Sequence, residues 1–228
     1  MLRSSYLILP LFCAALSTGC SEDSDDPAPE SAVNSLEDGL SFFVTSETHP
    51  TGDLGGIAGA DATCERLATA VGAGGRTWRA YLSAEDGGNG QPVNAGTRIG
   101  DGPWINANGM TVAADPATLH ARKGDAELFV DENGDRINGQ WTGSPMPVQH
   151  DVLTGSTPEG NVATGFTCAG WTSAAAEIFA KVGHSDGLGP MMSTADGRDS
   201  WNSAHDNGGC NDTNPRGGSG RFYCFAAD

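Results

Sequence analysis

Residues 55–72, GGIAGADATCERLATAVG, carry the clearest hydrophobic pattern in the chain. Apolar side chains recur there at the spacing of one face of an α-helix; they are Ala60, Cys64, Leu67, Ala68 and Val71. Gly72 follows the last of them, at the position where helices commonly end. The pattern predicts a helix over this segment with the thiol of Cys64 facing the core.

Short apolar runs bounded by glycine-rich turns predict strands in the rest of the chain, over residues 41–45, 77–83, 127–130, 140–142 and 220–226. In the run TWRAYLS, the side chains of Trp78, Ala80 and Leu82 alternate onto one face. Residues 173–183, SAAAEIFAKVG, fit either a second short helix or a loop that leads into a strand at 178–182. One or two helices with mostly antiparallel strands and long loops indicate an α+β fold.

The N-terminal segment has the pattern of an export signal. Arg3 precedes an apolar run of 11 residues, 6–16, which is too short to span a bilayer. The small residues at 17–19 before Cys20 resemble the lipobox of bacterial lipoproteins, although Ser17 stands where that motif usually has leucine. The resemblance implies a signal peptide over 1–19, lipidation of Cys20 and, because Ser21 follows, an outer-membrane or cell-surface location. An ordinary cleaved signal and a merely apolar segment are the alternatives.

Charge divides the remaining chain into a tether and a domain. Residues 21–39 contain seven of the 29 acidic residues, two prolines and no basic residue, so we expect a disordered acidic tether over 20–39. The domain over 40–228 then holds 22 acidic and 11 scattered basic residues. No basic stripe is available to neutralise phosphates, which argues against nucleic acid as a partner and leaves the lipid as the only membrane attachment.

Export makes the cysteine count informative. Setting aside Cys13 in the signal and Cys20 leaves an even set of four, which in an oxidising compartment predicts two disulfides; the four are Cys64, Cys168, Cys210 and Cys224. None belongs to a CxxC pair, so a structural zinc knuckle is not expected. Three pairings are possible, and the spacing alone does not choose among them.

Several motifs in order resemble the endostatin domain of certain collagens. They are the glycine-rich turn, Gly-Ala-Asp and single-cysteine helix of 55–83, the segment VLTGSTPEGN at 152–161, the pair Cys168-x-x-Trp171, and the closing run at 221–224. The same combination occurs in a domain of bacterial surface lipoproteins, and both are similar to the C-type lectin fold. The resemblance implies that fold for residues 41–227. It also implies nested disulfides, Cys64 with Cys224 and Cys168 with Cys210.

Two segments are candidates for calcium. Residues 131–135, DENGD, have the acid spacing of a calcium loop, but Arg136 and Thr142 stand where an EF-hand needs glycine and glutamate, so a tight turn is favoured. Trp201-Asn202 resembles part of the Trp-Asn-Asp motif of sugar-binding C-type lectins, with Ser203 in place of the aspartate. We expect no bound cofactor and no metal site, calcium being the one possibility.

The interval between Cys168 and Cys210 is the candidate ligand surface, since it corresponds to the long loop that meets ligands in the C-type lectin fold. Its polar and aromatic residues are His184, Asp186, Trp201, Asn202, His205 and Asp206. The alternative is that Trp201 is buried and the polar residues only close turns. The other histidines, His49, His120 and His150, are dispersed and are expected to be surface or hydrogen-bonded residues.

No catalytic motif is present: the chain has no Gly-x-Ser-x-Gly elbow, no His-Glu-x-x-His and no phosphate-binding loop. We therefore expect a lipid-anchored surface module of the cell envelope that acts in non-catalytic binding or adhesion, with an unidentified protein or glycan as partner. A metal-assisted carbohydrate-binding protein is the second interpretation, and an enzyme on a lectin-like fold is the third.

Overall fold

The computed structural model describes residues 39–228, which form a mixed α+β domain. The predicted signal peptide, Cys20 and nearly all of the predicted tether lie outside the described residues. The helices are α1 (Gly56–Ala70), α2 (Pro116–His120) and α3 (Cys168–Trp171), with 3-10 turns η1 (Ala95–Thr97), η2 (Pro190–Met192), η3 (Ala195–Gly197) and η4 (Pro215–Gly217). Among residues 39–228, none of the helices has the length and apolar character that a membrane span requires.

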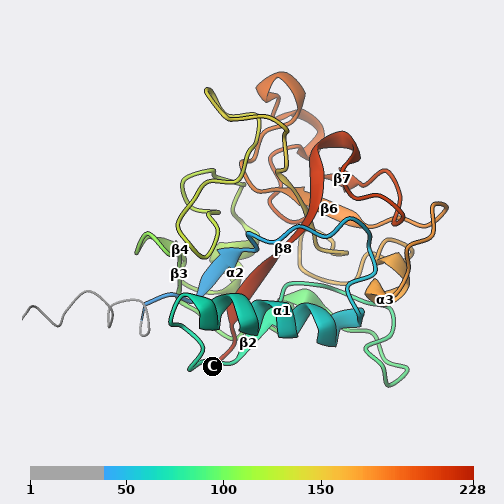
Figure 1. Ribbon diagram of the computed structural model, residues 1–228, viewed down its shortest axis with the longest axis horizontal. Helices are drawn as coiled ribbons and strands as arrows, with labels where there is room; N and C mark the ends of the chain where they lie inside the picture. Colours follow the sequence, from blue (N-terminus) through green and yellow to red (C-terminus); the bar gives the residue numbers. More distant parts are fainter. Residues whose placement is uncertain (1–38) are drawn as a thin grey trace, which may run out of the picture. The chain divides into compact units, whose positions relative to one another are not determined.

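The strands form one main sheet and one small one. Their bounds are β1 (Phe42–Val44), β2 (Trp78–Ala80), β3 (Trp104–Ile105), β4 (Thr111–Ala113), β5 (Asp151–Leu153), β6 (Lys181–His184), β7 (His205–Asp206) and β8 (Gly218–Ala226). The main sheet runs β1-β8-β5-β6-β7, with β2 also paired to β8, and β3 pairs with β4 separately. All pairs are antiparallel except β5 with β8. Figure 1 shows β8 passing through the middle of the domain and α1 lying across one end of it.

The sequence of β8 explains its central position, because both of its faces are buried. Phe222 and Cys224 pack with residues of α1 in one hydrophobic cluster, while Tyr223 and Phe225 belong to a second cluster on the other side. A strand buried on both faces has a nearly continuous apolar run instead of an alternating one. The sheet thus separates two cores, of which the first is covered by α1.

The predicted helix and both predicted disulfides are confirmed. Helix α1 buries Cys64 and Leu67 on one face, and Gly72 just beyond its end has a φ of +86°. Cys64 is bonded to Cys224, which ties α1 to β8, and Cys168 is bonded to Cys210. The second bond begins in α3, a single turn in which all four residues have positive φ.

The strands expected at 41–45, 77–83 and 220–226 are present as β1, β2 and β8, whereas those expected at 127–130 and 140–142 are wrong. Leu128 and Phe129 instead close a turn by donating their N–H groups to the carbonyl of Asp125. The N–H of Gln140 is bound by the Asp186 carboxylate, so it does not join a ladder. Of the two possibilities for 173–183, the structure has the loop, which leads into β6.

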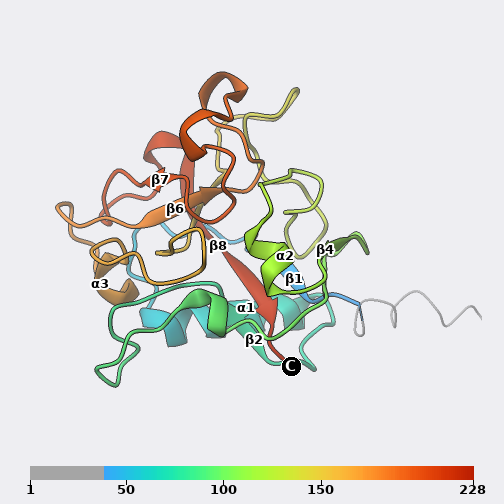
Figure 2. The same ribbon diagram turned by 180° about the vertical axis from the view of Figure 1, so that it is seen from behind.

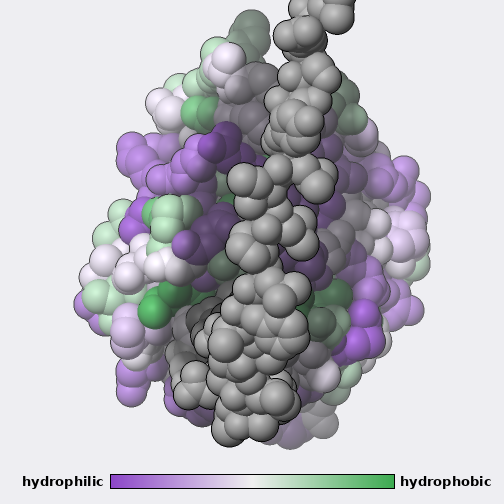
Figure 3. Space-filling view, turned by 60° about the vertical axis from the view of Figure 1, so that its left-hand side comes forward, coloured by the Kyte–Doolittle hydropathy of each residue, from purple (hydrophilic) through white to green (hydrophobic). Residues whose placement is uncertain are grey.

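The short helix α2 was not anticipated, although its sequence contains a start signal. Asp115 caps it by accepting the N–H of Thr118, and Pro116 is its first residue. The long connection between β6 and β7, drawn in orange, lies at the end of the domain opposite α1 (Figure 2). On the face shown in Figure 3 hydrophilic residues predominate, and the hydrophobic ones form small separate patches.

Candidate functional site

Three neighbouring strands place polar side chains on one face of the sheet. Asp151 of β5 is paired directly with His184 of β6, and His205 of β7 is paired with Val182, two positions before His184. Because side chains two positions apart in a strand share a face, all three polar groups point to the same side. His150 immediately precedes β5 and brings a third imidazole to the group.

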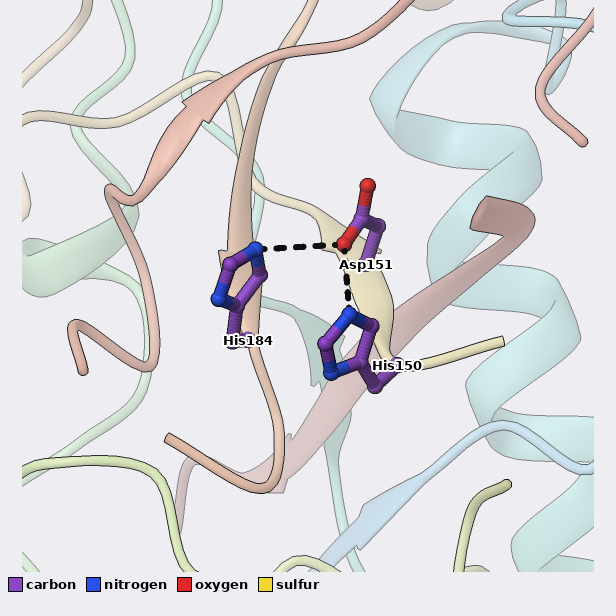
Figure 4. Close-up of side chains that lie close together, drawn as sticks. All are labelled: His150, Asp151 and His184. Atoms are coloured by element: carbon purple, nitrogen blue, oxygen red, sulfur yellow. Dashed lines mark ion pairs between the residues drawn. The ribbon is translucent and has the colours of Figure 1, made fainter. Parts of the chain in front are cut away.

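The carboxylate of Asp151 is the centre of this cluster. The Nε2 atoms of His150 and His184 each lie 3.3 Å from its Oδ1, and the Nε2 of His205 lies 3.3 Å from its Oδ2. Figure 4 shows the rings of His150 and His184 side by side, each with one nitrogen directed at the same carboxylate. These two rings are stacked, with centroids 4.4 Å apart and an interplanar angle of 9°.

The opposite nitrogen of each ring is fixed by a hydrogen bond. Nδ1 of His184 lies 2.7 Å from the carbonyl oxygen of Arg198, and Nδ1 of His205 lies 2.8 Å from that of Asp206. Because a carbonyl can only accept, both Nδ1 atoms must carry the hydrogen. In the neutral rings, Nε2 therefore has no hydrogen and carries a lone pair.

His150 is fixed in the same way by a carboxylate. Its Nδ1 lies 2.7 Å from Oδ1 of Asp186, which also accepts the N–H of Leu188, while Oδ2 accepts the N–H of Gln140. Burial raises the pKa of Asp186, but His150 and the backbone donors together lower it by more, so the pKa lies below the usual value of an aspartate. Because the ionised carboxylate of Asp186 can only accept, Nδ1 of His150 must be the donor. When the ring is neutral, Nε2 of His150 therefore also carries a lone pair.

The centre is buried, and several of its polar atoms lack hydrogen-bond partners among the described residues. Asp151, His150 and His184 are each at most 3% exposed. Within the described chain, neither oxygen of Asp151 has a hydrogen-bond partner, and neither has Nε2 of His184. Buried polar atoms normally find partners, so three lone pairs directed at an unpartnered carboxylate imply a positive charge between them.

The pKa shifts of Asp151 and His205 are those expected where a negative and a positive charge stabilise each other. Burial raises the pKa of Asp151, yet the imidazoles of His184 and His205 lower it below its usual value. Burial lowers the pKa of His205, but the Asp151 carboxylate raises it above the usual range. Either additional protons on the rings or a metal ion bound by Nε2 and the carboxylate would supply the charge that this arrangement favours.

The distances suit a small transition-metal ion. Ligand atoms about 2.0–2.1 Å from a tetrahedral Zn²⁺ are about 3.3 Å from one another, which is the separation between Oδ1 of Asp151 and Nε2 of both His150 and His184. The ligand atoms of His150, Asp151 and His184 all lie within 4.8 Å of one another, whereas His205 faces the second oxygen of Asp151 and is outside this group. The hydrogen bond from His150 to Asp186 is the carboxylate–histidine contact that commonly orients a metal-bound imidazole. Calcium is unsuited to three imidazoles because it takes oxygen ligands.

A pocket of about 520 Å³ opens onto this cluster. Its lining residues are Gln140, His150, His184, Pro190, Arg198, His205, Asp206 and Arg216. The side chain of His205 is 18% exposed, so the pocket reaches the imidazole side of the centre. The pocket therefore lies against the imidazole rings of the centre, whereas both oxygens of Asp151 and Nε2 of His184 are buried behind them.

The structure brings together some of the sequence-predicted site residues and separates others. His184 and His205 belong to the centre, Asp186 supports it, and Asp206 lines the pocket. Trp201 and Asn202, in contrast, are at most 1% exposed and do not form a surface. Asn202 instead donates to Tyr81 and to the carbonyls of Thr157 and Pro158, and Trp201 packs among aromatic rings.

The sequence reasoning missed His150 and Asp151. Their signal was an adjacent histidine and aspartate directly before the apolar residues of β5, where side chains at a strand end can enter a site. The calcium-like segment at 131–135 is a turn, as favoured: Oδ1 of Asp131 accepts the N–H groups of Asn133 and Asp135.

No protein-family model matches this chain, and no curated protein is significantly similar to it. The likeness to endostatin and C-type lectin domains stays a prediction that rests on the sequence motifs. The functional argument therefore depends on the geometry of the described residues.

Proposed function

We propose that this chain is an exported binding module whose centre is a divalent transition-metal ion. Its ligands are Nε2 of His150 and His184 and the carboxylate of Asp151, and His205 supports the centre from the second oxygen of that carboxylate. One observation carries the proposal: the hydrogen bonds at Nδ1 turn all three Nε2 lone pairs toward a buried carboxylate that lacks a hydrogen-bond partner. The proposal replaces the expectation that the chain holds no cofactor.

Zinc is the reference metal for this centre. Imidazole ligands suit Zn²⁺, Cu²⁺, Fe²⁺ and Ni²⁺, and the 3.3 Å separations at Oδ1 of Asp151 fit zinc. The alternative is a cluster held by protons alone, in which imidazolium groups face Asp151. The two states are related, because metal binding displaces protons from its ligands.

Export and anchoring complete the proposal. The two disulfides are typical of proteins that fold in an oxidising compartment. We place the mature chain on the outer membrane or cell surface, attached through a lipid on Cys20. A metabolic fatty-acid probe should label the wild type, whereas Cys20→Ala should lose the label; equal labelling of both would exclude this anchor.

The role assigned to the module is binding of an external protein or glycan through the metal, without catalysis. Its support is the C-type-lectin-like order of sequence motifs together with a pocket that reaches the metal ligands. Fold alone does not determine function, so the metal is the part of the proposal to test first.

Isothermal titration of tag-free, chelator-treated protein with Zn²⁺ tests the centre, since a polyhistidine tag would bind the same metal. His205→Gln is the test variant and His49→Gln is its matched control. Both histidine side chains are 18% exposed, both have a carboxylate within 3.5 Å, and both contact a backbone carbonyl through Nδ1. Only His205 belongs to the cluster.

Wild type and His49→Gln should bind one equivalent of Zn²⁺ with the same affinity, and His205→Gln should bind at least about tenfold more weakly. A second measurement uses the wild type alone: Co²⁺ should give the visible absorption spectrum of a site with several nitrogen ligands. Absence of stoichiometric Zn²⁺ and Co²⁺ binding to folded wild type would refute the metal centre.

A further inference from the structure

The mouth of the metal pocket has a charge opposite to that of the domain. Residues 40–228 have twice as many acidic as basic residues, yet two arginines, Arg198 and Arg216, line this one pocket. Five other arginines form ion pairs with carboxylates, namely Arg66, Arg76, Arg79, Arg98 and Arg136. Among the described residues, neither pocket arginine has a carboxylate within 4.0 Å.

Each of these arginines is connected to a hydrogen bond that orients an imidazole of the centre. The backbone carbonyl of Arg198 accepts Nδ1–H of His184. The guanidinium of Arg216 donates to the carbonyl of Asp206, at 3.4 Å, and that carbonyl also accepts Nδ1–H of His205. The backbone of Arg198 and the side chain of Arg216 therefore adjoin the hydrogen bonds that orient His184 and His205.

The remaining polar groups of the pocket do not cancel this charge. The carboxylate of Asp206 also lines the pocket, but it is paired with Lys181. Gln140 lines the pocket as well, and its backbone N–H is fixed by Asp186, so the position of that residue is defined. The stem of Arg198 packs against Gly189, where a Cβ would lie 3.0 Å from the arginine Cβ and Cγ.

We propose that the pocket binds a small oxyanion, a carboxylate or a phosphate, that coordinates the metal through one oxygen and is held by Arg198 and Arg216. This proposal rests on the proposed metal centre. Zn²⁺ with three protein ligands keeps a fourth position for an external ligand, and guanidinium groups bind carboxylates and phosphates through paired hydrogen bonds. A volume of about 520 Å³ admits a group of the size of a sugar acid.

The charge of the pocket separates this ligand class from a neutral sugar. Phosphate and glucuronate each offer an oxyanion, whereas glucose has the ring of glucuronate without the carboxylate. A phosphate group and an acidic sugar are two sources of the same chemistry, and the separate titrations distinguish them. Glucose is the matched neutral control.

The test titrates Co²⁺-loaded protein with phosphate, glucuronate or glucose and follows the visible spectrum of the metal. Arg198→Gln/Arg216→Gln is the test variant. Arg66→Gln/Arg136→Gln removes the same formal charge from two arginines that do not line the pocket, and it serves as the control. The Co²⁺ affinity of every variant is measured first, so that anion binding is compared at equal metal occupancy.

At least one oxyanion should change the spectrum saturably in wild type and in the control, and its dissociation constant should rise by about tenfold or more in the pocket variant. Glucose should leave the spectrum unchanged. If Co²⁺ binds but neither oxyanion changes the spectrum, or if glucose acts as strongly, the oxyanion proposal is overturned while the metal centre stands. Failure of Co²⁺ to bind would remove both proposals.

Discussion

The two ends of the main sheet are held together by different physical forces. At the end near α1, β1, β2 and β8 are packed between apolar clusters, and the Cys64–Cys224 bond joins helix to strand. At the other end, β5, β6 and β7 surround charged and imidazole groups that are almost completely buried. Burial of apolar surface stabilises without a partner, whereas burial of charge requires a compensating charge. Leu153 of β5 and Val182 of β6 share the apolar cluster beneath α1, so the two ends differ in the buried charge of the second, which depends on what occupies it.

The largest expected effect is on the apolar end. Cys64→Ala/Cys224→Ala should lower the free energy of unfolding by about 2–5 kcal/mol, because the bond restricts the unfolded chain. Its loop spans 160 residues against 42 for Cys168–Cys210. The chain-entropy model then makes removal of the first bond about 1 kcal/mol more costly than removal of the second. Urea denaturation of both double variants measures the difference, and an equal or reversed order would contradict it.

The second-largest expected effect is the stabilisation of the polar end, formed by β5, β6 and β7, by a bound metal ion. Free Zn²⁺ at 100 times its dissociation constant should raise the free energy of unfolding by about 2.7 kcal/mol, because the ion binds only the folded protein. Thermal unfolding with and without a chelator measures the gain, which His49→Gln should retain and His205→Gln should largely lose. Hydrogen exchange should show the increased protection at amides such as His184, whose N–H is bonded to the carbonyl of Ser200. An unchanged melting temperature in wild type would show that the polar end is complete without metal.

Asp186→Asn should weaken Zn²⁺ binding by about 10- to 100-fold, the usual range for a carboxylate that supports a metal-bound histidine. The two oxygens of Asp186 accept N–H groups from His150, Leu188 and Gln140. Whichever way an asparagine amide turns, its NH₂ would meet one of these donors, and His150 would lose a charged acceptor.

Asp131→Asn is the matched control for that change. Asp131 is also buried and its Oδ1 accepts two backbone N–H groups, but it lies in the turn at 131–135, away from the histidines. Calorimetric titration of both variants should show that Asp131→Asn keeps the wild-type Zn²⁺ affinity. Equal affinities in Asp186→Asn and wild type would show that the contact with His150 does not support the metal.

The apolar end could be predicted from the sequence because its signals are local. The helical spacing around Cys64 and the continuous apolar run of β8 each identify an element without knowledge of the rest of the fold. The disulfide pairing followed from the order of motifs resembling endostatin, since spacing alone left three choices. The strands at 127–130 and 140–142 were wrong because contacts made only in the folded chain, such as Gln140 with Asp186, hold those segments in turns.

The proposed metal centre was only half predictable, because it depends on strand register. His184 and His205 were noted as a pair, but nothing in the sequence places Asp151 opposite His184 or β5 next to β6. Trp201 and Asn202 show the converse case: their place in a ligand surface is wrong, and the alternative in which Trp201 is buried is confirmed. They lie in the same loop interval as the ligands, yet a large aromatic ring and an amide with several backbone partners are stabilised by burial.

The smallest expected effect gives the sharpest comparison of the two ends. The bond whose removal costs less stability should be the one whose removal weakens Zn²⁺ binding more. The 168–210 interval closed by Cys168–Cys210 contains His184, His205 and Arg198, whereas Cys64–Cys224 holds no ligand directly. Cys168→Ala/Cys210→Ala should therefore weaken Zn²⁺ binding by about tenfold, as expected when contacts that support ligands are loosened. Cys64→Ala/Cys224→Ala should bind with nearly the wild-type affinity, despite its larger loss of stability.

Both disulfide variants must be titrated at a temperature where circular dichroism shows them folded, so that affinity is not confused with the unfolded fraction. Their unfolding free energies and Zn²⁺ affinities then form two independent rankings of the same pair. Opposite rankings would mean that the two ends of the sheet are separately maintained, one by apolar packing and the other by an ordered loop around a cation. If both measurements rank the bonds in the same order, the metal site is only as stable as the domain as a whole, and the distinction between the two ends fails.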